Sequence, residues 1–198
     1  MLRFRVILAS SFVVACAACS QGGAATSPSP SDTPTLSSPT APSTPTSTLP
    51  STLVGYSAKE RTAYLAAVRA YNEFSRRNDS FYAAGRTTGA AKRFYQRYAV
   101  DWSTAWGNLA QAANNHVKVT GSTNIVWTKP QSIKLGQSMG DVVVLRRCLD
   151  ESGWVVTQNG KVLDQPQLKQ PHVDTIRLEK HPGEDWWRAG VAKQGPTC

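Results

Sequence analysis

The chain has 198 residues, with 22 Lys and Arg against 13 Asp and Glu, and a formal charge of +9. Hydrophobic residues make up 40% of it, which excludes both a wholly disordered chain and a membrane protein with many spans. All six Trp and all six Tyr fall within residues 56–187, whereas seven of the twelve Pro fall within residues 28–50. We therefore expect one folded domain over residues 56–198, which suffices for one core and is too short for two.

The first residues have the pattern of an export signal. Arg3 and Arg5 give a short positive start, and residues 6–18 follow without a charge. This apolar run is shorter than the roughly 20 residues that a membrane-spanning helix needs. A positive start, a short apolar run and small residues before a cleavage point are typical of a secretory signal peptide, which we predict over residues 1–18.

The end of this segment resembles a lipobox, the sequence that marks bacterial lipoproteins. Ala17 and Ala18 precede Cys19, and a short Ser-Gln-Gly-Gly stretch follows it. The resemblance implies that the cysteine thiol receives a diacylglyceryl group and that this cysteine becomes the first residue of the mature chain. Cys19 is the predicted lipidation site, and Cys16 is the alternative. The resemblance also implies an extracytoplasmic protein, anchored by its lipid to the outer face of the cell membrane.

Residues 20–52 consist almost entirely of Ser, Thr, Pro, Ala and Gly, with Asp32 as their one charge. Such a segment buries too little apolar surface to offset the entropy cost of ordering it. We therefore predict a disordered tether that, with the lipidated cysteine, covers residues 19–55. At about 3.1 Å per residue in polyproline II conformation, its reach would be on the order of 100 Å. Its composition is also typical of O-glycosylated stalks.

The domain begins with three predicted helices. The first starts at Ser57, which forms the capping-box pattern with Glu60, and ends near residues 76–79. The second covers about residues 88–99, and the third covers about residues 103–114. Apolar spacing predicts buried stripes at Tyr64, Leu65, Val68, Tyr71 and Phe74 in the first helix and at Ala91, Phe94, Tyr95 and Tyr98 in the second.

After Gly121 the pattern changes to that of strands. The predicted strands cover residues 124–135, 141–148, 153–156, 173–180 and 186–192, with a hairpin turn at Asn159 and Gly160. Alternation along residues 173–180 places Ile176 and Leu178 on one face. Helices followed by an antiparallel meander predict an α+β domain, with N-terminal helices packed on a curved antiparallel sheet.

This order of parts resembles the nuclear transport factor 2-like fold, also called SnoaL-like or cystatin-like, which is cone-shaped. Residues 174–178 and 185–191 are similar to the last two strands of that family. Residues 144–153, with Cys148, Asp150 and Ser152, resemble a strand end in uncharacterised lipoproteins of high-GC Gram-positive bacteria, in which a late cysteine ends the chain. The resemblance implies the cone fold. It implies no single activity, because the fold hosts isomerases, dehydratases, ligand carriers and interaction modules.

Cys148 and Cys198 are the two cysteines outside the signal region. A pair of cysteines in an exported domain predicts a disulfide, and two free thiols or a metal site are the alternatives. No other Cys or His lies within five positions of either cysteine, so we predict no metal site. No cofactor motif is present in the sequence either.

The sequence assigns no catalytic residue. His116, His172 and His181 lack the spacing of metal ligands and are predicted to lie at a helix end or in turns. No phosphate-binding loop, dinucleotide motif or nucleophile elbow occurs. Catalytic members of the cone family use an Asp–His or Tyr–Asp pair, but no spacing here requires one. The residues that could be assembled into such a pair are Tyr95, Tyr98, Asp101, His172 and Asp174.

Two adjacent tryptophans, Trp186 and Trp187, fall in the last predicted strand. Neighbouring residues of a strand face opposite sides, so one of the two is expected in the core. A flat two-tryptophan platform for sugars is therefore not predicted.

Positive charge is concentrated in the predicted helices. Residues 56–100 hold nine basic and three acidic residues, a net charge of +6, whereas residues 101–198 have a net charge of +2. Nucleic acid is not the expected partner of a protein outside the cell. The charge favours an anionic lipid or wall polymer there, because each basic residue near such a surface contributes about 1 kcal/mol. A solvated helix face is the alternative. The candidate contact residues are Arg76, Arg77, Lys92, Arg93 and Arg97.

These features predict an exported, membrane-anchored lipoprotein that acts as a non-catalytic binding or interaction module at the cell envelope. The alternative is a carrier of a small apolar ligand, or an enzyme that uses the pocket of the cone. The sequence identifies no protein partner.

Overall fold

The computed structural model describes residues 51–190 and 192–198; the predicted signal peptide, both candidate lipidation cysteines and most of the predicted tether lie outside the described residues. A short 3-10 helix over Ser51–Leu53 comes first. Three helices follow it, α1 (Ala58–Ala84), α2 (Gly89–Tyr98) and α3 (Trp102–Asn114). Leu53 is 1% exposed and packs in the core, so the core reaches back beyond the predicted domain start at residue 56.

Each helix begins at a residue whose side chain satisfies free backbone N–H groups of the first turn. Ser57 and Glu60 form a reciprocal capping box at α1, and the Thr88 side chain caps α2. Asp101 caps α3 by accepting a hydrogen bond from the N–H of Thr104 at 3.1 Å. The three predicted helices are confirmed, and Asp101 has a structural role at the start of α3.

Helix α1 is longer than predicted. The sequence predicts an end near residues 76–79, but the helix runs on to Gly85, whose φ of +62° gives a left-handed C-cap. Tertiary packing explains the extra turn, because the rings of Phe81 and Phe94 meet edge to face with centroids 5.4 Å apart. The packing of Phe81 on Phe94 thus stabilises the helix beyond the polar residues 76–79.

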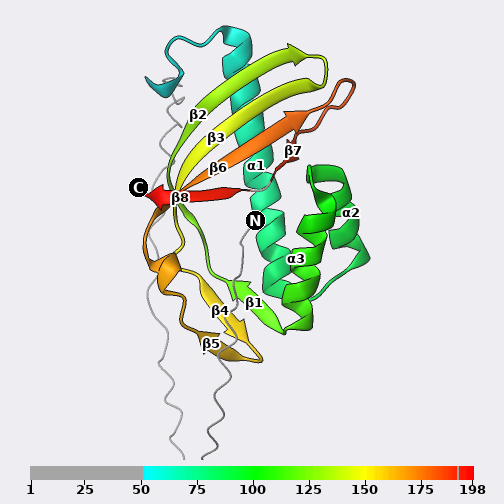
Figure 1. The fold of residues 1–198 in the computed structure, drawn as a ribbon, viewed down its shortest axis with the longest axis vertical. Helices are drawn as coiled ribbons and strands as arrows, with labels where there is room; N and C mark the ends of the chain where they lie inside the picture. The colour runs from blue at the N-terminus through cyan, green and yellow to red at the C-terminus, as the bar shows by residue number, and fades with distance from the viewer. Residues whose placement is uncertain (1–50, 191) are drawn as a thin grey trace, which may run out of the picture. The chain divides into compact units, whose positions relative to one another are not determined.

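The larger sheet has the strand order β2 (Asn124–Gln137), β3 (Gly140–Asp150), β6 (His172–Lys180) and β7 (Arg188–Ala189), and β8 (Lys193–Thr197) also pairs with β6. All of these pairings are antiparallel. The strands β2, β3 and β6 curve across α1 (Figure 1). The predicted α+β class, with helices packed on a curved antiparallel sheet, is confirmed, and the arrangement is consistent with a cone.

A smaller antiparallel sheet has the order β1 (Val117–Thr120), β4 (Val155–Gln158) and β5 (Lys161–Leu163). The predicted hairpin turn joins β4 to β5, where Asn159 and Gly160 have φ of +51° and +77°. A second 3-10 helix, over Pro166–Lys169, leads back to β6.

The predicted last strand over residues 186–192 is wrong in its extent. The chain forms two short strands instead, and both pair with the same edge of β6: β7 beside Leu178 and Glu179, and β8 beside the stretch from His172 to Thr175. Between them the N–H of Gly190 donates to the carbonyl oxygen of Arg177 at 2.7 Å. A Cβ at Gly190 would lie 2.9 Å from that oxygen, so this close approach requires glycine.

The core lies between α1 and the larger sheet. The β3 residues Val143 and Leu145 and the β6 residues Ile176 and Leu178 are fully buried on the sheet face that packs against α1. The prediction that Ile176 and Leu178 share one face is confirmed. A second cluster fills the space between the three helices. Leu65 was predicted to be buried but is 40% exposed. The buried face of α1 is centred on Tyr64 and Ala67, and Leu65 lies at the edge of that face.

Candidate functional site

A cluster of charged side chains lies buried at one end of the core. Antiparallel register places Arg147 of β3 opposite Asp174 of β6, and it places Leu149 opposite His172. These residues continue the alternation of the apolar core face, so Arg147 and His172 face inward. Arg147, Glu151 and His172 are 3%, 5% and 7% exposed, which makes this a buried polar cluster.

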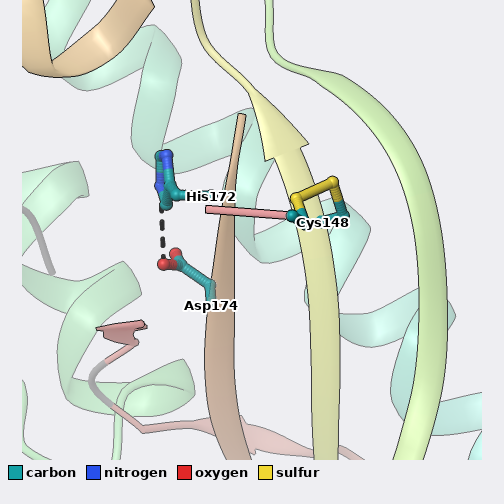
Figure 2. Close-up of a disulfide and its surroundings, with 4 residues drawn as sticks. Cys148, His172 and Asp174 are labelled. Carbon is teal, nitrogen blue, oxygen red and sulfur yellow. Dashed lines mark ion pairs between the residues drawn. A yellow bond between two sulfur atoms is a disulfide. The ribbon is translucent and has the colours of Figure 1, made fainter. Parts of the chain in front are cut away.

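His172 lies between two carboxylates. Its Nε2 is 3.5 Å from Oδ1 of Asp174 (Figure 2) and 3.9 Å from Oε2 of Glu151. Glu151 is supplied by the residue after β3, whereas His172 and Asp174 both come from β6. The imidazole can therefore pair with either carboxylate across a distance slightly longer than a direct hydrogen bond.

Arg147 joins this group to α1. Its guanidinium donates from Nη2 to Oδ1 of Asn72 at 3.0 Å and lies 4.8 Å from the ring centre of Tyr71. A cation over an aromatic face is favourable, and more so when both are removed from water. The long helix thus supplies the polar and aromatic partners for a cation on the sheet.

Burial raises the pKa of both carboxyls of the cluster. Burial, with the negative charges of Asp174 and Asp79, raises the pKa of Glu151 to about 7. Burial also raises the pKa of Asp174, although the positive charges of His172 and Arg147 oppose this shift. Raised carboxyl pKa values of this kind are concentrated at functional sites.

Two donors or acceptors of the cluster lack a partner. Nε of Arg147 and Nδ1 of His172 are buried and have no hydrogen-bond partner within residues 51–190 and 192–198. An unsatisfied buried polar group costs about 1–3 kcal/mol, so native proteins keep few of them.

Two residues of this cluster were named in the sequence analysis, without a site being predicted from them. His172 and Asp174 were considered there as an Asp–His pair, and the structure brings them together. The prediction that His172 is a surface or turn residue is wrong, because it begins β6 and is 7% exposed. Arg147 was missed, although the alternation from Val143 through Leu145 would have placed it inward. No local signal marks Glu151.

The predicted disulfide is confirmed. Cys148 and Cys198 are joined, with Cα atoms 6.0 Å apart and a sequence separation of 50. Cys148 pairs in register with Val173, so its side chain lies on the sheet face opposite His172 and Asp174 (Figure 2). The bond ties β8 to the central strand of the sheet.

The five candidate contact residues for an anionic surface are all exposed on α1 and α2. Arg76 and Arg77 pair with Glu73 at 2.7 and 3.2 Å, and their side chains remain 74% and 55% exposed. The guanidinium of Arg77 lies 5.7 Å from the ring centre of Phe94, where the two helices meet. The three other candidates, Lys92, Arg93 and Arg97, are exposed on α2.

The remaining histidine and tyrosine candidates lie apart from the cluster. His116 is exposed after α3, and His181 lies 3.7 Å from Glu179 in the turn after β6. The Tyr95 hydroxyl donates to Oδ1 of Asn78 at 2.9 Å. These residues have surface or packing roles, and so has Tyr98, whose ring packs against Phe94.

The two adjacent tryptophans have different surroundings, as predicted. Trp187 is 7% exposed and belongs to the core. The guanidinium of Arg97 covers the ring of Trp186 at 4.4 Å. The pair therefore forms no flat platform.

No protein-family model matches the chain, and a search of curated proteins found no match. Among the residues that the structure describes, no group of three or more His, Cys, Asp or Glu side chains could hold a metal ion. Within the same ranges, no helix is both long and apolar enough to cross a membrane.

Proposed function

We propose that the chain is an exported lipoprotein of the cell envelope and that its domain docks on anionic phospholipid through α1 and α2. The export signal and Cys19 supply the anchor in this proposal, and the tether gives the domain the freedom to turn one face toward the membrane. The observation that carries the docking step is the excess of exposed basic side chains on these two helices.

The acidic residues of α1 offset part of this excess, because α1 carries five basic and three acidic side chains, whereas α2 carries three basic and no acidic ones. Glu60 is held by the capping box at the start of the helix. Glu73 is shared between Arg76 and Arg77, and exposed pairs of this kind contribute at most about 1 kcal/mol. Burial raises the pKa of Asp79.

The basic residues of α2 are free to meet phosphate groups. Within the described ranges, Lys92 and Arg93 form no ion pair, and both side chains are exposed. With Arg76 and Arg77 they give four cations on neighbouring helices. At about 1 kcal/mol for each residue, the four together would contribute roughly 4 kcal/mol, or about a thousandfold in affinity.

Cosedimentation with vesicles tests this proposal. The chain from residue 20 onward, without lipid, should bind vesicles that contain phosphatidylglycerol and should not bind vesicles of phosphatidylcholine alone. Replacing Arg76, Arg77, Lys92 and Arg93 by Gln should abolish the preference. A matched control replaces four exposed basic residues elsewhere, Lys118, Lys129, Lys134 and Lys161, by Gln and should leave binding unchanged. Equal binding to the two kinds of vesicle would refute docking by charge.

A second function, acid–base chemistry or ligand carriage in the cone, is favoured by the buried cluster around His172. His172, Asp174 and Glu151 combine a close imidazole–carboxylate pair with a carboxyl that titrates near pH 7. Native mass spectrometry of protein purified from its own host tests this function. A bound mass that is lost in a His172→Gln variant would support it, and a ligand-free mass would oppose it.

A further inference from the structure

A groove of about 420 Å³ lies between α1, α2 and the segment that follows β6. Its volume falls within the roughly 300–1,000 Å³ of pockets that hold small ligands. The groove is separate from the buried cluster around His172, since none of the residues of that cluster lines it. It is therefore a second place where a ligand could bind.

The floor of the groove is an apolar strip along α1. Ala66, Ala70 and Phe74 follow one another at intervals of four residues, so they lie on one face of the helix. At 1.5 Å per residue the strip is about 12 Å long. The two alanines leave space above the helix, and Phe94 and Trp186 supply aromatic walls. Such a strip fits an extended alkyl chain.

The rim of the groove carries cations without partners. Arg69 and Lys180 line the groove and form no ion pair among the described residues. A third lining cation, Arg77, is paired with Glu73, and the remaining lining acid is Asp185. With two unpaired cations, the rim is suited to an anionic head group.

We infer that this groove binds an amphiphilic anion of the fatty-acid type. The alkyl chain lies over Ala66 and Ala70, and the carboxylate pairs with the unpaired cations of the rim. This inference goes beyond docking on a membrane, because it concerns the binding of single amphiphile molecules. Of the four residues tested for docking, Arg76, Arg77, Lys92 and Arg93, only Arg77 lines the groove.

Titration calorimetry with three probes tests the inference. Decanoate, decyltrimethylammonium and decyl maltoside share one chain and differ in head-group charge, and each is used below its micelle concentration. The protein is the chain from residue 20 onward, secreted so that the disulfide forms. Decanoate should bind at one site, at least about tenfold more tightly than the two other probes, as expected when a charge-assisted contact is present. Equal affinity for the three probes, or no binding of decanoate, would overturn the inference.

Variants locate the site. Arg69→Gln and Lys180→Gln should each weaken decanoate binding about tenfold. Asp185→Asn is the matched control on the same rim and should strengthen binding, because it removes a like charge. Ala70→Leu should block binding, because the larger side chain fills the space above the apolar strip. If this variant does not fold, Arg69→Gln and Lys180→Gln still test the site. Decanoate affinity that is unchanged in both Arg69→Gln and Lys180→Gln would refute this site. Since no vesicles are present, the result is independent of the docking proposal.

Discussion

Replacing Cys148 and Cys198 together by Ser removes the covalent link between the central strand β3 and the last strand β8. The bond closes a loop of 50 residues. In the chain-entropy model a loop of this length lowers the entropy of the unfolded chain by about 14 cal/mol/K, or about 4 kcal/mol at 25 °C. We expect the double variant to lose about this much of its free energy of unfolding.

The loss should have a local signature in β8. All five residues of this strand are exposed, and three residue pairs join it to β6. Without the disulfide, little apolar burial would hold it in place, so its amides should exchange much faster than those of β3. Removing β8 would also uncover the edge of β6 beside His172.

Urea denaturation of the wild type and the double variant measures the global effect, and thermal melting should show a decrease of roughly 8–16 °C for a chain of this size. Hydrogen exchange of β8 measures the local effect. A difference below about 1 kcal/mol would refute the chain-entropy argument. Two titratable thiols in the untreated, denatured protein would refute the disulfide itself.

Three further predictions concern the anchor, the buried cluster and a glycine. Cys19→Ser should move the protein from the detergent phase to the aqueous phase or leave its signal uncleaved, and equal partitioning of variant and wild type would exclude the anchor. The pKa of Glu151 is about 7 in the folded protein, above its ordinary 4.5, so the stability that its protonated carboxyl contributes is fully present below pH 4.5 and is lost as the pH rises to 7. Glu151→Gln should therefore reduce the loss of stability between pH 4.5 and 8 by about 3 kcal/mol, measured by urea denaturation at each pH. Gly140→Ala should cost at least about 1–3 kcal/mol in the same assay, because Gly140 has a φ of +107° and its Cβ would lie 2.1 Å from the carbonyl oxygen of Lys180.

The starts of the helices were predictable because their signals are local. Ser57 with Glu60 and the side chain of Asp101 act within one turn of the residues they cap. The end of α1 was not predictable in this way, since Phe81 stabilises the last turns by packing on Phe94, a residue of another helix. The split of the last strand likewise depends on the long-range contact between Gly190 and Arg177.

The buried cluster around His172 also could be predicted only where local sequence signals suffice. Alternation along β3 and β6 is a local property, and it suffices to place Arg147 and Asp174 on the core face. The position of Glu151 depends on the path of the chain after β3, and its raised pKa depends on burial by elements distant in sequence. A sequence read alone therefore gives candidate residues, whereas their distances and charge states require the fold.

The measurement that tests the central claim most directly is the salt dependence of vesicle binding. The claim predicts that the chain from residue 20 onward binds phosphatidylglycerol vesicles at low salt and is released as the Debye length falls below about 8 Å, near 0.15 M salt. The variant with Gln at Arg76, Arg77, Lys92 and Arg93 should remain in the supernatant at every salt concentration. Binding by the wild type that does not change with salt, or binding by the variant equal to that of the wild type, would contradict the account.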